Sequence, residues 1–159
     1  MHYSYYKSRH VLNIDKKTVI LFFATIIWMG VIFWFSSQPA NDSAALSGEL
    51  ARIFRNLLNS LFGGKIPGFL RWLFFENQFF IRKAGHFMEY FILGLLVSGL
   101  IFRQNFKRKF LISVLICFFY AVSDEIHQMF VPGRGPMVTD VMLDTSGAFI
   151  AALLNLCRK

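Results

Sequence analysis

Four stretches of the sequence are apolar almost throughout, and each is long enough to cross a membrane as a helix. They cover residues 18–35, 85–102, 110–131 and 139–157. About 20 apolar residues in a helix span the roughly 30 Å hydrocarbon core of a bilayer. The pattern therefore predicts an all-α integral membrane bundle of four transmembrane helices, preceded by a polar, basic tail at residues 1–17.

Residues 43–81, between the first two stretches, show a different pattern. Apolar residues recur there about every 3.6 positions, which is the period of a helix with one apolar face. The glycines at positions 63 and 64 are expected to end this helix, and residues 67–81 to form a second short piece. A helix of this kind lies along a membrane surface rather than through the bilayer. We therefore predict an interfacial helical segment over residues 43–81.

The composition agrees with a membrane protein and excludes several other classes. Of the 159 residues, 55% are hydrophobic and only 16% are charged, below the roughly 25% of a soluble domain. So apolar a chain is not disordered, and two cysteines are too few for a disulfide scaffold. The net charge of +8 does not indicate a nucleic-acid partner, because basic residues also collect beside membrane spans.

The distribution of basic residues predicts the orientation of the spans. Ten of the 17 lysines and arginines lie in three short segments, at residues 1–17, 103–109 and 158–159. In a four-span protein these segments share one side of the membrane, and positive charge favours the cytoplasmic side. We therefore expect both termini to be cytoplasmic and the 43–81 segment to be extracytoplasmic.

Alternating helix directions bring the polar residues of the spans to one level near the outer leaflet. These residues lie at the end of the first and third spans and at the start of the second and fourth. Ionisable residues are costly inside a span, so they are expected to face inward and pair with one another. The predicted polar layer comprises Ser36, Ser37, Gln38, Arg82, Lys83, His86, Glu89, Asp124, Glu125, His127, Gln128, Arg134, Asp140 and Asp144.

Motifs in this layer resemble those of the VanZ-like family of bacterial membrane proteins. The shared pieces are Phe35-Ser-Ser-Gln38, Arg82-Lys-Ala-Gly-His86-Phe-Met-Glu89-Tyr90, Asp124-Glu-Ile-His-Gln128, Phe130-Val-Pro-Gly-Arg134 and Asp140-Val-Met-Leu-Asp144. The family is named for a protein that gives low-level resistance to the glycopeptide teicoplanin. The resemblance implies a single domain over residues 18–157 in the bacterial cell membrane, and a role in the cell envelope linked to glycopeptide resistance.

One hypothesis is an enzyme that acts on a membrane lipid or a lipid-linked cell-wall precursor at the outer leaflet. Basic side chains would hold its phosphate head group, buried carboxylates would serve as base, and histidines would shuttle the proton. The sequence contains no nucleotide-binding motif, so no nucleotide cofactor is expected. The head-group ligands are then Arg82, Lys83, Arg134, Gln128, Ser37 and Gln38, and the catalytic candidates are Glu89, Asp124, Glu125, His86 and His127, supported by Asp140, Asp144 and Tyr90.

A metal centre is an alternative use of the same residues. His86-x-x-Glu89 and Asp124-x-x-His127 each place one imidazole and one carboxylate on a single helical face. Mixed nitrogen and oxygen ligands suit zinc, manganese or iron. Three nearby basic residues would oppose a cation at this place. The sequence leaves open whether a divalent metal ion is bound.

Other hypotheses involve no chemistry. The layer could hold a lipid head group in a non-enzymatic binder or translocator, or the protein could mask cell-wall precursors as a structural membrane protein. A buried ion-pair network that only ties the bundle together is a simpler explanation of the charges. The inner halves of the spans hold few polar residues, which disfavours transport through a single chain. Assembly into a homo-oligomer also stays open.

Overall fold

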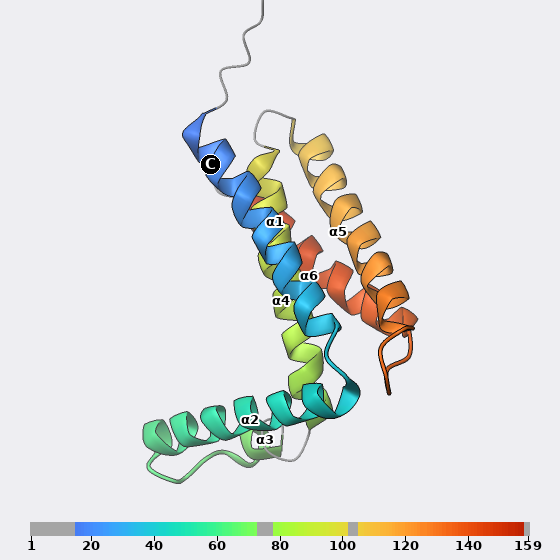
Figure 1. The fold of residues 1–159 in the computed structure, drawn as a ribbon. Coiled ribbons are helices and arrows are strands. Elements are labelled where there is room, and N and C mark those ends of the chain that lie inside the picture. Colours follow the sequence, from blue (N-terminus) through green and yellow to red (C-terminus); the bar gives the residue numbers. More distant parts are fainter. Residues whose placement is uncertain (1–14, 73–77, 102–104, 158–159) are drawn as a thin grey trace, which may run out of the picture.

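The structure is a computed structural model that describes residues 15–72, 78–101 and 105–157. Within these ranges the chain forms six α-helices and no β-strand, which confirms the predicted all-α fold (Figure 1). The helices are α1 (Lys16–Ser36), α2 (Ala40–Phe62), α3 (Gly68–Arg71), α4 (Gln78–Leu100), α5 (Phe106–Gln128) and α6 (Val138–Cys157). Parts of the predicted tail, interfacial segment and basic segments, at residues 1–14, 73–77, 102–104 and 158–159, lie outside the described residues.

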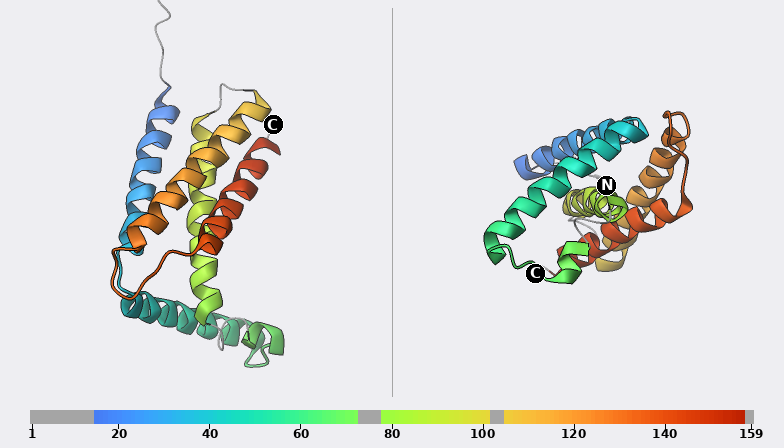
Figure 2. Two further views of the ribbon diagram at one scale, coloured as in Figure 1. Left: turned by 90° about the vertical axis from the view of Figure 1, so that its right-hand side faces the viewer. Right: turned by 90° about the horizontal axis from the view of Figure 1, so that it is seen from below.

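Four long helices, α1, α4, α5 and α6, pack as a bundle, and α2 lies across one end of it (Figure 1, Figure 2). The first residues of α1 and the last described residues of α6 lie at the opposite end (Figure 2). The end of α1, the start of α4, the end of α5 and the start of α6 therefore share the half of the bundle nearest α2 (Figure 2). This half is the one in which the predicted polar layer lies.

Each predicted span corresponds to one long helix, with shifted ends. α4 begins at Gln78, so Arg82 and Lys83, which were expected at the start of the second span, lie inside the helix. α5 ends at Gln128 rather than at residue 131, because the chain turns there and the N–H of Val131 donates to the carbonyl of Gln128, 3.1 Å away. Helix ends follow the backbone hydrogen bonds, which hydropathy alone does not reveal.

The predicted amphipathic helix is present as α2. It ends at Gly63, whose φ of 58° lies in the left-handed region that glycine adopts without strain. Only Ser47 and Ala51 are buried along this helix. An apolar face left uncovered by the described part of the chain is typical of an interfacial helix. The exposed apolar residues of α2 are Leu46, Leu50, Ile53, Phe54, Leu57, Leu61 and Phe62.

The closest contact in the bundle is between α4 and α6, where small residues let the two backbones approach. A Cβ atom added at Gly94 would lie 2.8 Å from the backbone of Ala148 and 2.9 Å from the Cβ of Ala151. One added at Gly147 would collide with the carbonyl oxygen of Phe87. Small residues at helix crossings allow the close packing on which membrane bundles depend. This contact fixes the position of the polar residues on α4 relative to those on α6.

Side-chain hydrogen bonds tie α1 to its neighbours. The indole N–H of Trp28 donates to the backbone carbonyl of Glu89 in α4, 2.9 Å away. The hydroxyl of Tyr120 in α5 donates to the carbonyl of Met29 at 2.6 Å. About one turn further along α1, Ile32 is fully buried in the core. α1 is thus held against both α4 and α5.

Two helices in the described part of the chain, α1 and α5, are long and apolar enough to cross a membrane. Only 11% of the apolar window of α1 and 28% of that of α5 is buried, so most of this surface faces outward. The core helix of a soluble protein would be mostly buried. Together with the uncovered face of α2, these exposed helices suggest a membrane protein, as the sequence predicted.

Candidate functional site

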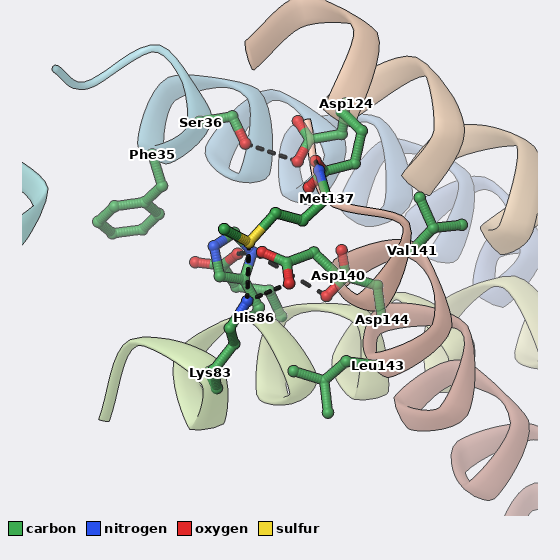
Figure 3. Close-up of polar contacts among 12 residues, drawn as sticks. Phe35, Ser36, Lys83, His86, Asp124, Met137, Asp140, Val141, Leu143 and Asp144 are labelled. Carbon is green, nitrogen blue, oxygen red and sulfur yellow. Dashed lines mark hydrogen bonds and ion pairs between the residues drawn. The ribbon is translucent and has the colours of Figure 1, made fainter. Parts of the chain in front are cut away.

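The predicted polar residues come together from all four helices of the bundle. Figure 3 shows Lys83 and His86 of α4, Asp124 of α5, and Asp140 and Asp144 of α6 pointing toward one another, with Ser36 of α1 beside Asp124. The i, i+3 and i, i+4 spacings of the sequence place these groups on the inward faces of their helices. The site is therefore built by helix packing and not by a loop.

Asp124 is held by two donors. The hydroxyl of Ser36 donates to its Oδ2 at 2.7 Å, and the amide of Gln128 donates to the same oxygen at 3.2 Å. The three side chains are at most 4% exposed. The other oxygen, Oδ1, has no hydrogen-bond partner among the described residues. One oxygen of this carboxylate is thus fixed by two hydrogen bonds, while the other has no hydrogen bond within the described chain.

Lys83 and Asp140 form an ion pair between α4 and α6. The ammonium also lies 5.0 Å from the centre of the Phe79 ring. Both charged side chains are largely withdrawn from solvent, so each compensates the other at low dielectric. This pair removes one base and one acid from those available to a ligand.

His86 lies between two carboxylates that it does not hydrogen-bond. Its Nδ1 is 3.9 Å from Oε2 of Glu89 and 3.9 Å from Oδ1 of Asp144. Asp144 is fully buried, and neither of its oxygens has a hydrogen-bond partner in the described part of the chain. Ligand atoms of His86, Asp124 and Asp144 all lie within 4.8 Å of one another. These three residues could hold a metal ion.

Glu125 and Tyr90 occupy supporting positions. Oε2 of Glu125 accepts the backbone N–H of Met137 at 2.7 Å, which ties the end of α5 to the chain entering α6. Tyr90 is fully buried in the core beneath the layer, and its hydroxyl has no partner among the described residues.

Arg134 reaches the site from the turn between α5 and α6. Its guanidinium donates to the carbonyl of Phe35 at 3.4 Å. The preceding Gly133 has a φ of 75°, and the N–H of Ala40 in α2 donates to the carbonyl of Pro132 at 3.2 Å. Burial lowers the pKa of Arg134, but a guanidinium remains protonated at neutral pH. The turn therefore presents a permanent positive charge.

Two small cavities meet at the arginines. One, of about 110 Å³, lies between α1, α2 and α4 and includes Gln38 and Glu89 in its lining; the other, of about 100 Å³, includes Gln128 and Asp140. Both are lined by Arg82, His86 and Arg134. In the described part of the chain neither arginine forms an ion pair with a carboxylate, whereas Lys83 does. The cavities thus bring two guanidinium groups, neither of them in an ion pair within the described chain, close to buried acids.

The structure separates some predicted residues from this centre. Nε2 of His127 lies 3.1 Å from the hydroxyl of Ser37, and its ring stacks on Phe33. Gln38 lines the larger cavity and donates to the carbonyl of Trp34 at 3.1 Å. Asp144 stands with His86 and Asp124 in the group that could hold a metal ion, while His127 faces α1.

Ser36 belongs to the predicted polar layer but not to its candidate ligands or catalytic residues, although it is 1% exposed and bonded to Asp124. A signal for it exists in the sequence. The buried residues of α1 are Thr25, Ile32 and Ser36, which are spaced as one helical face. Ser37, the neighbouring serine, lies off that face.

Comparison with known proteins identifies the family. A model of the family described as VanZ/LLP1 matches residues 21–158, which include every residue of the polar layer. No curated protein and no solved structure was found to match the chain. The match agrees with the motifs at the ends of the four long helices. The chain therefore belongs to the VanZ/LLP1 family.

Proposed function

We propose that the protein crosses the bacterial cytoplasmic membrane with α1, α4, α5 and α6, and that α2 lies on its outer surface. Both termini are then cytoplasmic. Three observations support this topology: the exposed apolar surface of α1 and α5, the uncovered apolar face of α2, and the basic residues at the starts of α1 and α5. Those starts lie at the end of the bundle away from α2 (Figure 2). Positive charge favours the cytoplasmic side.

At the outer end, the two arginine-lined cavities bind the phosphate or diphosphate head group of a membrane lipid or a lipid-linked envelope precursor. The observation that carries this function is that Arg82 and Arg134 line both cavities without a carboxylate partner in the described chain. A guanidinium binds a phosphate through two parallel hydrogen bonds. The uncovered apolar face of α2 borders the larger cavity, where it would contact the lipid chain.

Glu89 lines the same cavity as the two arginines, so it is the carboxylate placed to exchange a proton with a bound head group or water.

Binding on one side is favoured over transport across the membrane. All buried carboxylates of the described chain, Asp124, Glu125, Asp140 and Asp144, lie near the end of α5 or the start of α6, in the half nearest α2 (Figure 2). If the ligand is a lipid-linked cell-wall precursor, its capture would connect the site to the glycopeptide resistance for which the family is named.

Binding of a short polyprenyl diphosphate to the purified protein in detergent tests this function. We expect the diphosphate to raise the unfolding temperature and the matching uncharged polyprenol to have no effect, because only the former can engage the arginines. Arg134→Lys should weaken binding at least tenfold, since it loses the bidentate contact.

Arg52→Lys provides the matched control. Arg52 lies on exposed α2 and pairs with Glu49, away from the cavities, so its replacement should leave the dissociation constant unchanged. Equal binding of diphosphate and polyprenol, or wild-type affinity in Arg134→Lys, would contradict the proposed head-group site.

A further inference from the structure

Three metal-ligating side chains from three helices converge beside the arginine-lined cavities. His86 comes from α4, Asp124 from α5 and Asp144 from α6, and one ligand atom of each lies within 4.8 Å of the other two. We propose that these residues bind one divalent transition-metal ion. The inference is independent of the proposed head-group function, because metal content is measured without any lipid.

The three residues carry buried polar atoms that have no hydrogen-bond partner in the described part of the chain. Among the described residues, Nδ1 of His86, Oδ1 of Asp124 and both oxygens of Asp144 have no hydrogen-bond partner. Asp144 is fully buried and Asp124 is 3% exposed. Buried polar atoms are nearly always satisfied, and an unpaired buried carboxylate is strongly unfavourable. Several unsatisfied acceptors directed at one point form the environment that a metal ion completes.

The side chains around the group leave the carboxylates of Asp124 and Asp144 without a lysine or arginine as ion-pair partner in the described part of the chain. Lys83 is engaged by Asp140, and the guanidinium of Arg134 donates to a backbone carbonyl. In the described chain no lysine or arginine forms an ion pair with Asp124 or Asp144. Arg82 and Arg134 line the adjacent cavities and oppose a cation, but the carboxylates would contact the ion directly.

The donor set indicates the class of metal. One imidazole and two carboxylates form a mixed nitrogen and oxygen site, which suits manganese, iron or zinc. Ligands about 2.0 to 2.2 Å from one ion are at most about 4.4 Å apart, so a small rotation of these side chains would close the site. Oε2 of Glu89, 3.9 Å from Nδ1 of His86, is the nearest further carboxylate oxygen.

The cavities give the site an open coordination position. His86 lines both of them, so an ion bound at its ring is reachable from the arginine side. A phosphate oxygen held by Arg134 could then occupy that position. A metal ion bound there would act as a Lewis acid toward the head group. This role extends the proposed function, and head-group binding does not depend on it.

Metal content of the purified full-length protein tests the proposal. The chain would carry an affinity tag without histidine, be purified without chelator, and be analysed by elemental mass spectrometry. We expect about one manganese, iron or zinc ion per chain. Asp144→Asn and His86→Gln should each lower that content at least tenfold, because each removes a direct ligand.

Matched control variants distinguish these ligands from their neighbours. Glu125→Gln removes a buried carboxylate that already accepts the N–H of Met137, and His127→Gln removes a histidine that faces Ser37. Both should retain the wild-type metal content. A loss in the controls equal to that in Asp144→Asn would overturn the assignment, as would full retention of metal in Asp144→Asn.

A second measurement does not depend on the folding of any variant. Wild-type protein stripped with a chelator should unfold at a lower temperature, and titration with Mn²⁺, Fe²⁺ or Zn²⁺ should restore it in a saturable way. Failure of all three ions to bind the stripped, folded protein would overturn the proposal. Loss of lipid binding with unchanged metal content would instead argue only against the head-group function.

Discussion

Replacing Gly147 by alanine is expected to separate α6 from α4 and to destabilise the bundle. The added Cβ would collide with the carbonyl oxygen of Phe87 and lie 3.2 Å from the backbone nitrogen of Phe91. Ordinary carbon contacts are about 3.5 to 4.0 Å. Because the atoms in the way are backbone atoms, no side-chain rotation relieves the overlap, and the helices have to move apart.

The size of the effect follows from two opposing contributions. Overpacking a close contact costs roughly 1 to 3 kcal/mol, and a backbone collision belongs at the upper end. Alanine is favoured over glycine in a helix by about 1 kcal/mol. The net loss in unfolding free energy is therefore about 2 kcal/mol, or roughly a thirtyfold change in the folding equilibrium.

Equilibrium unfolding in mixed micelles with increasing dodecyl sulfate, followed by circular dichroism, measures this loss. Gly30→Ala in α1 is the control, because a Cβ there meets nothing within 4 Å. It should be neutral or slightly stabilising. If Gly147→Ala proves as stable as Gly30→Ala, the close α4–α6 contact is not what holds the bundle together.

Two further predictions concern topology and the attachment of α1. In a chain without its native cysteines, a cysteine at position 42 or 135 should react with a membrane-impermeant maleimide in intact cells. One at position 105 should react only after permeabilisation, and its labelling from outside would reverse the proposed orientation. Tyr120→Phe should lower the unfolding free energy by about 1 kcal/mol by removing the bond to the carbonyl of Met29, and an unchanged value would show that this bond is not stabilising.

The elements of the fold were predictable because their signals are local. Apolar runs and the 3.6-residue period identify the helices, and Gly63 ends α2 as its position in the sequence indicates. The convergence of the polar layer follows from alternating helix directions. Arg82 and Lys83 lower the local hydropathy at the start of α4, and in the structure Lys83 is paired with Asp140.

The pairing within the polar layer was not predictable, because it depends on how each helix is rotated about its axis. Asp124 and His127 are three residues apart on α5, yet Asp124 faces the centre and His127 faces Ser37 and Phe33. A rotation of α5 about its axis by part of a turn decides which of these two side chains faces the centre. The close α4–α6 contact sets that rotation for Asp144, and no local sequence pattern records it.

The closest helix pair also imposes an order on assembly. α4 and α6 are separated in the chain by the whole of α5, so α4 cannot meet its nearest partner until a long loop closes. Contacts of α1 and α5 with α4 can form earlier, because they do not require α6. Asp140 and Asp144 then reach Lys83 and His86 only when α6 docks. The contacts of Lys83 and His86 with α6 are therefore completed together with the close packing of Gly94 and Gly147, so one docking event assembles both the tightest helix crossing and the charges beside it.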